Sequence, residues 1–260
     1  MFRIIKEQLR TLGLLAQQNF VDEMVEHLQT FTPAHARSIG PAAIKHIIEM
    51  GLPRAGHYRF TQRGPVRLYI ELMFLFGSDF DTDPQYVWAA DILNRGWDGE
   101  PQLRRATDLF GQTNRFLEAV AGPQKRYALE GLRRAHSCKL FFTPTPEEPF
   151  ADQMLQAFCR LAPEKYAFVG PKQLDLLIHH GIAKAQSYQA QTLTDQCSLI
   201  LLMFWLGHGC LEDPQFPWIQ LTLEKRPTHP ERDVFEALRR KALVFLKSAI
   251  DNSKNQQAVE

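Results

Sequence analysis

Apolar residues recur along most of this chain at intervals of three and four, the spacing of one face of an α-helix. Ile44, Ile47 and Ile48 set this spacing in one short segment. The same pattern predicts further helices at residues 4–31, 65–76, 101–121, 123–137, 194–206 and 230–250. No stretch alternates between apolar and polar residues beside a hairpin turn, so no β-sheet is predicted. The pattern therefore predicts an all-α fold.

The chain also contains a diverged second copy of its own pattern. Placing each residue over the one 130 positions further on aligns residues 20–89 with residues 150–219 without a gap, and 19 of the 70 pairs are identical. The identical pairs include Gly, Pro and Trp, which chance similarity between helices does not produce. We predict a tandem duplication of a helical-bundle repeat, with repeats at residues 1–137 and 150–260 packed as one unit and a Pro/Thr-rich linker at 138–149.

Glycine, proline and aspartate residues that begin, cap or end helices occur at matching positions in both copies. In the first copy, Pro41 is predicted to begin a helix that Gly51 closes, and Gly77 to end the central, most apolar helix. Asp83 then caps a further helix through its side chain, with Pro84 at the first helical position. The corresponding residues of the second copy are Pro171, Gly181, Gly207, Asp213 and Pro214. The polar residues 252–260 are predicted to form a frayed tail.

Composition and charge narrow the class of protein. Of the 260 residues, 45% are apolar, and 30 Lys and Arg stand against 29 Asp and Glu. This composition is typical of a globular protein, and the net charge is too small to attract nucleic acid or anionic lipid to the whole molecule. The N-terminus lacks the apolar core of a secretory signal, and the longest apolar run, residues 199–206, is far shorter than the roughly 20 residues of a membrane span. We therefore expect a cytoplasmic protein whose four cysteines are reduced and mostly buried.

The most suggestive local motif is the acidic loop formed by Asp79, Asp81 and Asp83, which are two residues apart. This spacing begins a calcium-binding loop. The rest of that pattern is missing, because Pro84 stands where a glycine is needed and Ala90 where a bidentate glutamate is needed. The second copy keeps only the last of the three acids. A helix cap is therefore favoured over a metal site, and the first two acids are predicted to form an acidic surface patch.

Other metal or catalytic constellations are weaker. His179, His180, His208 and Cys210 are residues of zinc-ligand type, but adjacent histidines point about 100° apart on a helix and do not readily share an ion. No serine lies in a Gly-x-Ser-x-Gly turn, no cysteine has a motif-spaced histidine, and the sequence has neither a phosphate loop nor a dinucleotide fingerprint. We therefore predict no catalytic residue, no metal and no cofactor.

Basic residues form two groups, one with Arg54, Arg59, Arg63 and Arg67 and another at residues 239–241. Acidic or apolar residues interrupt or flank both groups, which is typical of a solvated helix face rather than a nucleic-acid interface. We therefore predict no nucleic-acid partner.

Trp97 lies in a glycine-bounded loop that has no counterpart in the second copy. A loop tryptophan can anchor a partner protein, and the alternative is that it is buried between the repeats. Features found in one copy only are where a specific function can be added after duplication. We therefore predict a partner-binding site formed by Asp79, Asp81 and Trp97, in which the acids favour a basic or amphipathic segment of a client.

Two segments resemble a known group of proteins. The sequences LYIELMFLFGSDFDTDP at residues 68–84 and FVDEMVEHL at residues 20–28 resemble small uncharacterised bacterial proteins encoded beside type VI secretion spike and effector genes. The resemblance covers residues 1–95 and fades after them. Members of the group often carry Leu-Pro-Trp after the Asp-Pro, where this chain has Tyr-Val-Trp and, in the second copy, Phe-Pro-Trp. The resemblance implies a genetic setting but no enzymatic activity and no catalytic residues.

Duplication and resemblance together predict a non-enzymatic, cytoplasmic binding protein, an adaptor or chaperone for a type VI effector or spike component. A duplicated helical scaffold supplies a groove between its halves, which suits binding. Two alternatives stay open: an immunity protein that neutralises a cognate toxin, and a metal-dependent enzyme that uses the acidic loop. The expected partner is a bacterial effector, toxin or spike protein, and neither nucleic acid nor a membrane is expected.

Overall fold

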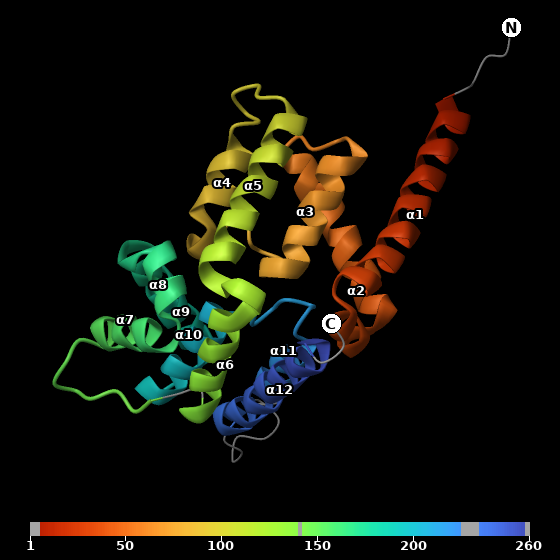
Figure 1. Ribbon diagram of the computed structural model, residues 1–260. Coiled ribbons are helices and arrows are strands. Elements are labelled where there is room, and N and C mark those ends of the chain that lie inside the picture. Colours follow the sequence, from red (N-terminus) through yellow and green to blue (C-terminus); the bar gives the residue numbers. More distant parts are fainter. Residues whose placement is uncertain (1–5, 140–141, 225–233, 258–260) are drawn as a thin grey trace, which may run out of the picture.

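In the computed structural model, which describes residues 6–139, 142–224 and 234–257, the chain folds into α-helices and two short 3-10 helices joined by turns (Figure 1). The described residues contain no β-strand. The predicted all-α fold class is therefore confirmed over the described part of the chain.

Each segment that was predicted to be helical contains a helix; residues 4, 5 and 230–233 of those segments lie outside the described residues. The helices of the first half are α1 (Lys6–Phe31), α2 (Pro33–His57), α3 (Arg63–Phe76), η1 (Pro84–Tyr86), α4 (Val87–Asn94) and α5 (Gln102–Ala121). Between the halves lie η2 (Pro123–Lys125) and α6 (Arg126–Ser137). The helices of the second half are α7 (Phe150–Leu161), α8 (Pro163–Val169), α9 (Pro171–Ser187), α10 (Leu193–Leu206), α11 (Pro217–Leu223) and α12 (Val234–Gln257).

Each half has its own hydrophobic core around one buried helix. In the first core α3 buries Tyr69, Ile70 and Met73 completely, and in the second core residues 197–204 of α10 are all buried. The helix that was predicted to be central in each copy is therefore buried in its core. No helix in the described ranges combines the length and apolarity needed to cross a membrane. Helix α6, which the sequence assigned to the first repeat, packs on the second core through Ala135.

The backbone takes the same uncommon conformations at positions 130 residues apart. The φ angle is 80° at Gly40 and 85° at Gly170, each of which directly precedes the proline that begins a helix. Arg59 and Gln189, which are not glycines, have φ angles of 58° and 57°. The backbone therefore makes the same turns at matching positions of the two ranges that align in sequence.

Gly51 and Gly181 do not close their helices, so that prediction is wrong. Helix α2 continues to His57 and α9 to Ser187. A Cβ atom on Gly181 would lie 2.4 Å from Cγ1 of Ile200 in α10, and one on Gly51 would lie 2.8 Å from the sulfur of Met73 in α3. Both glycines instead allow their helix to approach the central helix of its core.

The two terminal helices are long. The first part of α1 extends beyond the body of the molecule (Figure 1), and its Leu12, Leu14 and Leu15 are 54%, 60% and 57% exposed. Helix α12 continues to Gln257, so the predicted frayed tail is wrong for residues 252–257. Residues 258–260 of that prediction lie outside the described residues.

Replacing Gly181 with alanine tests the close approach of α9 to α10. The added methyl group must displace the fully buried Ile200, and overpacking of this kind lowers the free energy of unfolding by about 1–3 kcal/mol. A Cβ atom on the helical Gly56 would meet nothing within 4 Å. We expect Gly181→Ala to lower the urea midpoint and Gly56→Ala to leave it unchanged or raise it. Equal midpoints would contradict the close packing.

Candidate functional site

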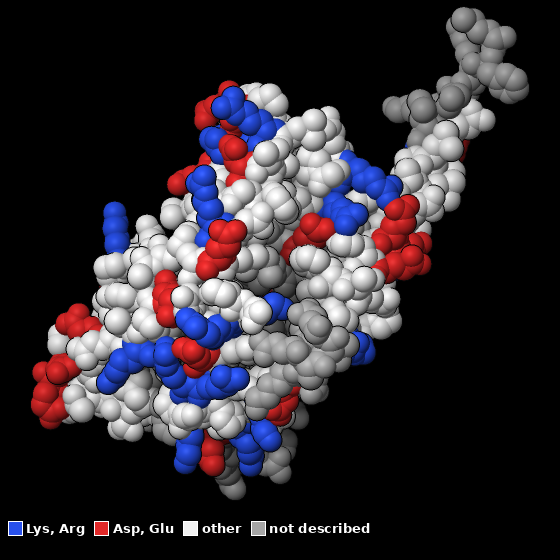
Figure 2. All heavy atoms as spheres, in the orientation of Figure 1, with Lys and Arg blue, Asp and Glu red and all other residues white. Residues whose placement is uncertain are grey.

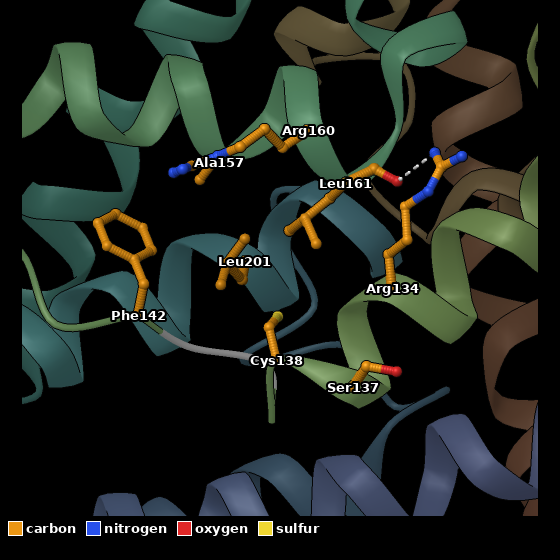
Figure 3. A pocket seen from close by; sticks show the side chains of 8 residues that line it. All are labelled: Arg134, Ser137, Cys138, Phe142, Ala157, Arg160, Leu161 and Leu201. Carbon is orange, nitrogen blue, oxygen red and sulfur yellow. Dashed lines mark hydrogen bonds between the residues drawn. The ribbon is translucent and has the colours of Figure 1, made fainter.

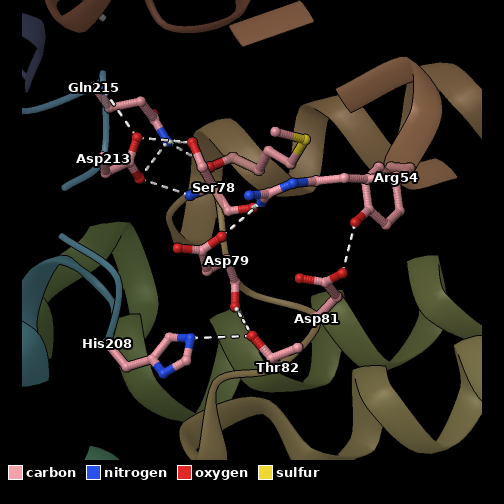
Figure 4. A network of polar contacts seen from close by, with 10 residues as sticks. Arg54, Ser78, Asp79, Asp81, Thr82, His208, Asp213 and Gln215 are labelled. Carbon is pink, nitrogen blue, oxygen red and sulfur yellow. Dashed lines mark hydrogen bonds and ion pairs between the residues drawn. The ribbon is translucent and has the colours of Figure 1, made fainter. Parts of the chain in front are cut away.

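The carboxylates of the acidic loop point to different partners (Figure 4). Asp79 accepts a hydrogen bond from Nη1 of Arg54 at 2.6 Å, and Asp81 accepts one from the Tyr69 hydroxyl at 2.8 Å. Asp83 caps the next turn. The loop therefore does not gather its oxygens around one cation, and the described residues include no group of three or more His, Cys, Asp or Glu side chains placed to hold a metal ion.

Asp81 is only 8% exposed, so the predicted acidic surface patch is wrong. Phe80, which is 1% exposed, draws the loop into the first core, where its ring packs 5.1 Å from the Tyr69 ring. Burial, together with the negative charge of Asp81, raises the pKa of Tyr69 far above its usual range. Asp79 is part-buried and paired with Arg54. The sequence did not reveal these partners, because they lie on other helices.

Asp83 and Asp213 each reach across to the other half. The backbone N–H and the hydroxyl of Ser78 donate hydrogen bonds of 2.7 Å to the two carboxylate oxygens of Asp213 (Figure 4). The backbone N–H of His208 donates a bond of 2.7 Å to Asp83. Each aspartate also accepts a bond from the backbone N–H two residues further on. This confirms the predicted cap at Asp83, which opens η1. After Asp213 the chain forms a turn and α11 begins only at Pro217, so the predicted helix start at Pro214 is wrong. Each carboxylate therefore holds a turn in its own half and a turn in the other half.

Two buried glutamines repeat this reciprocal arrangement. The side-chain amide of Gln85 donates to the carbonyl of Met203 at 3.2 Å, and that of Gln215 donates to the carbonyl of Met73 at 2.8 Å. Both acceptors lie in the last turn of a central helix, and each also accepts a hydrogen bond of 3.0 Å from the backbone N–H of the glycine that ends the helix. Each glutamine therefore adds a second hydrogen bond to a carbonyl of the opposite half.

Glycine is required where the ends of α3 and α10 meet. A Cβ atom on Gly77 would lie 2.9 Å from the carbonyl oxygen of Leu206, and one on Gly207 would lie 2.6 Å from that of Phe76. The φ angles of the two glycines, 101° and 96°, are also in the region that other residues rarely adopt. The sequence predicted that these glycines end the helices, and the structure adds that they permit contact between the halves.

The acidic loop and its counterpart in the second half face each other. A Cβ atom on Gly209, the position that matches Asp79, would lie 2.0 Å from an oxygen of the Asp79 carboxylate. A side chain at Gly209 would therefore require the Asp79 side chain to move. This contact accounts for a glycine at the position opposite Asp79.

Two buried basic side chains lie beside these aspartates. The ammonium of Lys165 donates to the carbonyl of Phe204, and burial lowers the pKa of Lys165 to about 8, although the charge of Asp83 raises it. His35, at the matching position of the first half, contacts Oε1 of Gln215 at 3.2 Å, and burial lowers the pKa of His35 as well. Burial raises the pKa of Asp83. The sequence pattern did not reveal these two side chains, because lysine is rarely buried and a lone histidine carries no local signal of burial.

Trp97 is 51% exposed, so it is not buried between the halves. The Arg59 guanidinium lies 4.6 Å from the centroid of the indole, and the ring of His57 contacts it edge-on at 5.5 Å. His57 and Arg54 are both in the last turn of α2. We call Arg54, His57, Arg59, Asp79 and Trp97 the α2 rim. The structure therefore brings two of the three predicted partner-binding residues to one end of α2 and places the third, Asp81, inside the core.

The other histidine and cysteine candidates do not gather, although the rings of His180 and His208 lie 6.1 Å apart. His208 lies 3.1 Å from the Thr82 hydroxyl, Cys210 is buried, and His179 pairs with Asp175 on its own helix at 3.4 Å. These contacts do not bring the predicted zinc-type residues around a common centre.

Arginines of the first basic group form ion pairs within the protein. Arg63 pairs with Glu23, and Arg67 pairs with Glu71 at 2.8 Å; both arginines lie on the surface. These pairs agree with the prediction of a solvated helix face.

Comparison of the sequence with protein families, with curated proteins and with solved structures finds no match in any of the three.

Replacing Asp213 with asparagine tests the contact between the halves. The amide cannot accept from both Ser78 donors, and the loss of bonds to a charged acceptor costs about 1.5–3 kcal/mol of unfolding free energy. Glu212→Gln is the matched control, because Glu212 is exposed and its ion pair with Lys184 lies at the surface, where such pairs contribute about 0–1 kcal/mol. We expect a lower guanidinium midpoint for Asp213→Asn alone. Equal losses in the two variants would show that the crossing bonds contribute nothing.

Because the pKa of Lys165 is lowered in the folded protein, we predict that the free energy of unfolding rises at alkaline pH. Between about pH 8 and the ordinary lysine pKa of 10.5, the unfolded chain binds a proton at this residue that the folded chain does not. The free energy of unfolding contributed by Lys165 therefore increases with pH across this window, by up to about 3 kcal/mol. We expect denaturant titrations at successive pH values to show this rise relative to Lys165→Met. Parallel pH profiles of the two proteins would contradict the lowered pKa.

Proposed function

We propose that this protein is a non-enzymatic, cytoplasmic binding protein, an adaptor or chaperone for a type VI secretion effector or spike component, and that the α2 rim is part of the surface that contacts the client. The observation that supports this role is the indole of Trp97, half exposed yet held between Arg59 and His57. The type VI setting rests on the sequence resemblance.

Physical reasons favour the α2 rim as a protein contact. Tryptophan and arginine dominate the energetics of protein interfaces. Contacts with Arg59 and His57 restrict the Trp97 side chain before binding, which lowers the entropy lost in a complex. Arg54 and Asp79 form an ion pair at the same end of α2 as Trp97. These charged groups can orient a partner by hydrogen bonds.

The rim favours an apolar or amphipathic segment of the client over a basic one. The expectation of a basic client depended on two exposed acids. Asp81 is buried, and the charge of Asp79 is balanced by Arg54. The remaining exposed feature is the indole with its arginine neighbour, which suits an apolar side chain.

We also propose that the two halves arose by tandem duplication. Matching φ angles at positions 130 residues apart and the reciprocal bonds of Asp83 and Asp213 support this origin. A metal-dependent enzyme is not proposed, because the carboxylates of the acidic loop bind separate partners.

Gene deletion in the native host, followed by complementation, tests the proposed function. We expect deletion to abolish export of the client effector without poisoning the cell. Export should return with the unaltered gene and with Phe110→Ala, which removes a similarly exposed aromatic side chain from α5, but not with Trp97→Ala. Self-poisoning on deletion would overturn the adaptor role and favour an immunity protein.

The Trp97 result depends on an intact fold. Because Trp97 is half exposed and outside both cores, we expect Trp97→Ala to keep the melting temperature within a few degrees of that of Phe110→Ala. Normal export with Trp97→Ala would place the client surface elsewhere on the protein.

A further inference from the structure

A cavity of about 550 Å³ lies between α6, α7 and α10, away from the contact between the halves and from the α2 rim (Figure 3). Ala157 and Leu161 of α7 and Leu201 of α10 form an apolar floor, and Phe142 covers one side. This volume is within the range of pockets that hold small molecules. The floor is suited to an aliphatic chain.

Two arginines border this apolar floor. In Figure 3 Arg160 extends to one side and Arg134 to the other, with Leu161 and Leu201 between them. Arg134 is already engaged, since it donates to the carbonyl of Leu161 at 3.5 Å and pairs with Glu130 at 3.4 Å. Arg160 is exposed, and no carboxylate of the described residues pairs with it. Arg160 is therefore the group available to an anion.

Helix α6 beside the cavity has a net positive charge. Arg126, Arg133 and Arg134 are exposed along it, and Glu130 pairs with Arg126 and Arg134. Figure 2 shows blue side chains gathered over this helix with red among them. An apolar chamber with a cationic edge complements a molecule that has an aliphatic body and an anionic head.

We propose that this cavity binds a long-chain aliphatic carboxylate, with the chain against Leu161 and Leu201 and the carboxylate at Arg160. The site does not depend on the proposed adaptor role, because it shares no residue with the α2 rim. Its occupant is a fatty acid rather than a segment of the client, because the lining offers one apolar chamber and one uncommitted cation.

The native cysteines of the chain can report on occupancy, so no reporter residue has to be introduced. Cys138 lines the cavity and is exposed, Cys159 is exposed but does not line it, and Cys197 and Cys210 are buried. The prediction that the cysteines are mostly buried therefore holds for two of the four. A bound chain covers the first thiol and leaves the second accessible.

Thiol labelling of the full chain, read by mass spectrometry, tests the proposal. We expect laurate, below its micelle concentration, to slow the labelling of Cys138 and leave that of Cys159 unchanged. Dodecanol should require about tenfold more ligand, because it lacks the charge that Arg160 binds. No protection of Cys138, or equal protection of both thiols, would overturn the proposed site.

Arginine variants separate the anionic contact from apolar binding. Arg160→Gln should weaken laurate protection about tenfold and leave dodecanol protection unchanged. Arg133→Gln, which removes an exposed arginine from α6 outside the lining, should leave both unchanged. Equal effects of the two variants, or equal protection by laurate and dodecanol in the unaltered protein, would overturn the role of Arg160.

Discussion

The contact between the turns after Gly77 and Gly207 constrains the rest of this protein. At this point two backbones approach more closely than any side chain would permit. The approach leaves backbone N–H groups inside the protein, and Asp83 and Asp213 accept hydrogen bonds from them. Because each aspartate also caps a turn of its own half, neither half can shift without breaking bonds in both.

The same contact accounts for the differences between the halves. Where the two loops face each other, the Asp79 carboxylate occupies the space that a side chain at Gly209 would need. A buried carboxylate is stabilised by nearby positive charge, and Lys165 lies beside Asp83. His35 occupies the matching place in the first half. The differences between the halves are therefore complementary across the contact.

The proposed binding surfaces lie away from this rigid centre. The α2 rim belongs to the first half, and the cavity between α6, α7 and α10 is built on the second core. A fixed contact between the halves keeps the distance and orientation between the two surfaces constant. Such a scaffold suits a protein that positions a client, because rigid elements present binding groups with little entropic cost.

The sequence by itself determined the helices, the central apolar helix of each half and the cap at Asp83, because these depend on residues a few positions apart. Only the tertiary structure decided that Asp81 points inward, that Gly51 serves helix packing and that Lys165 is buried. Each of these outcomes depends on a partner distant in sequence: Tyr69, Met73 and Phe204. Local pattern carries no information about such partners, since burial is set by which helix packs against which.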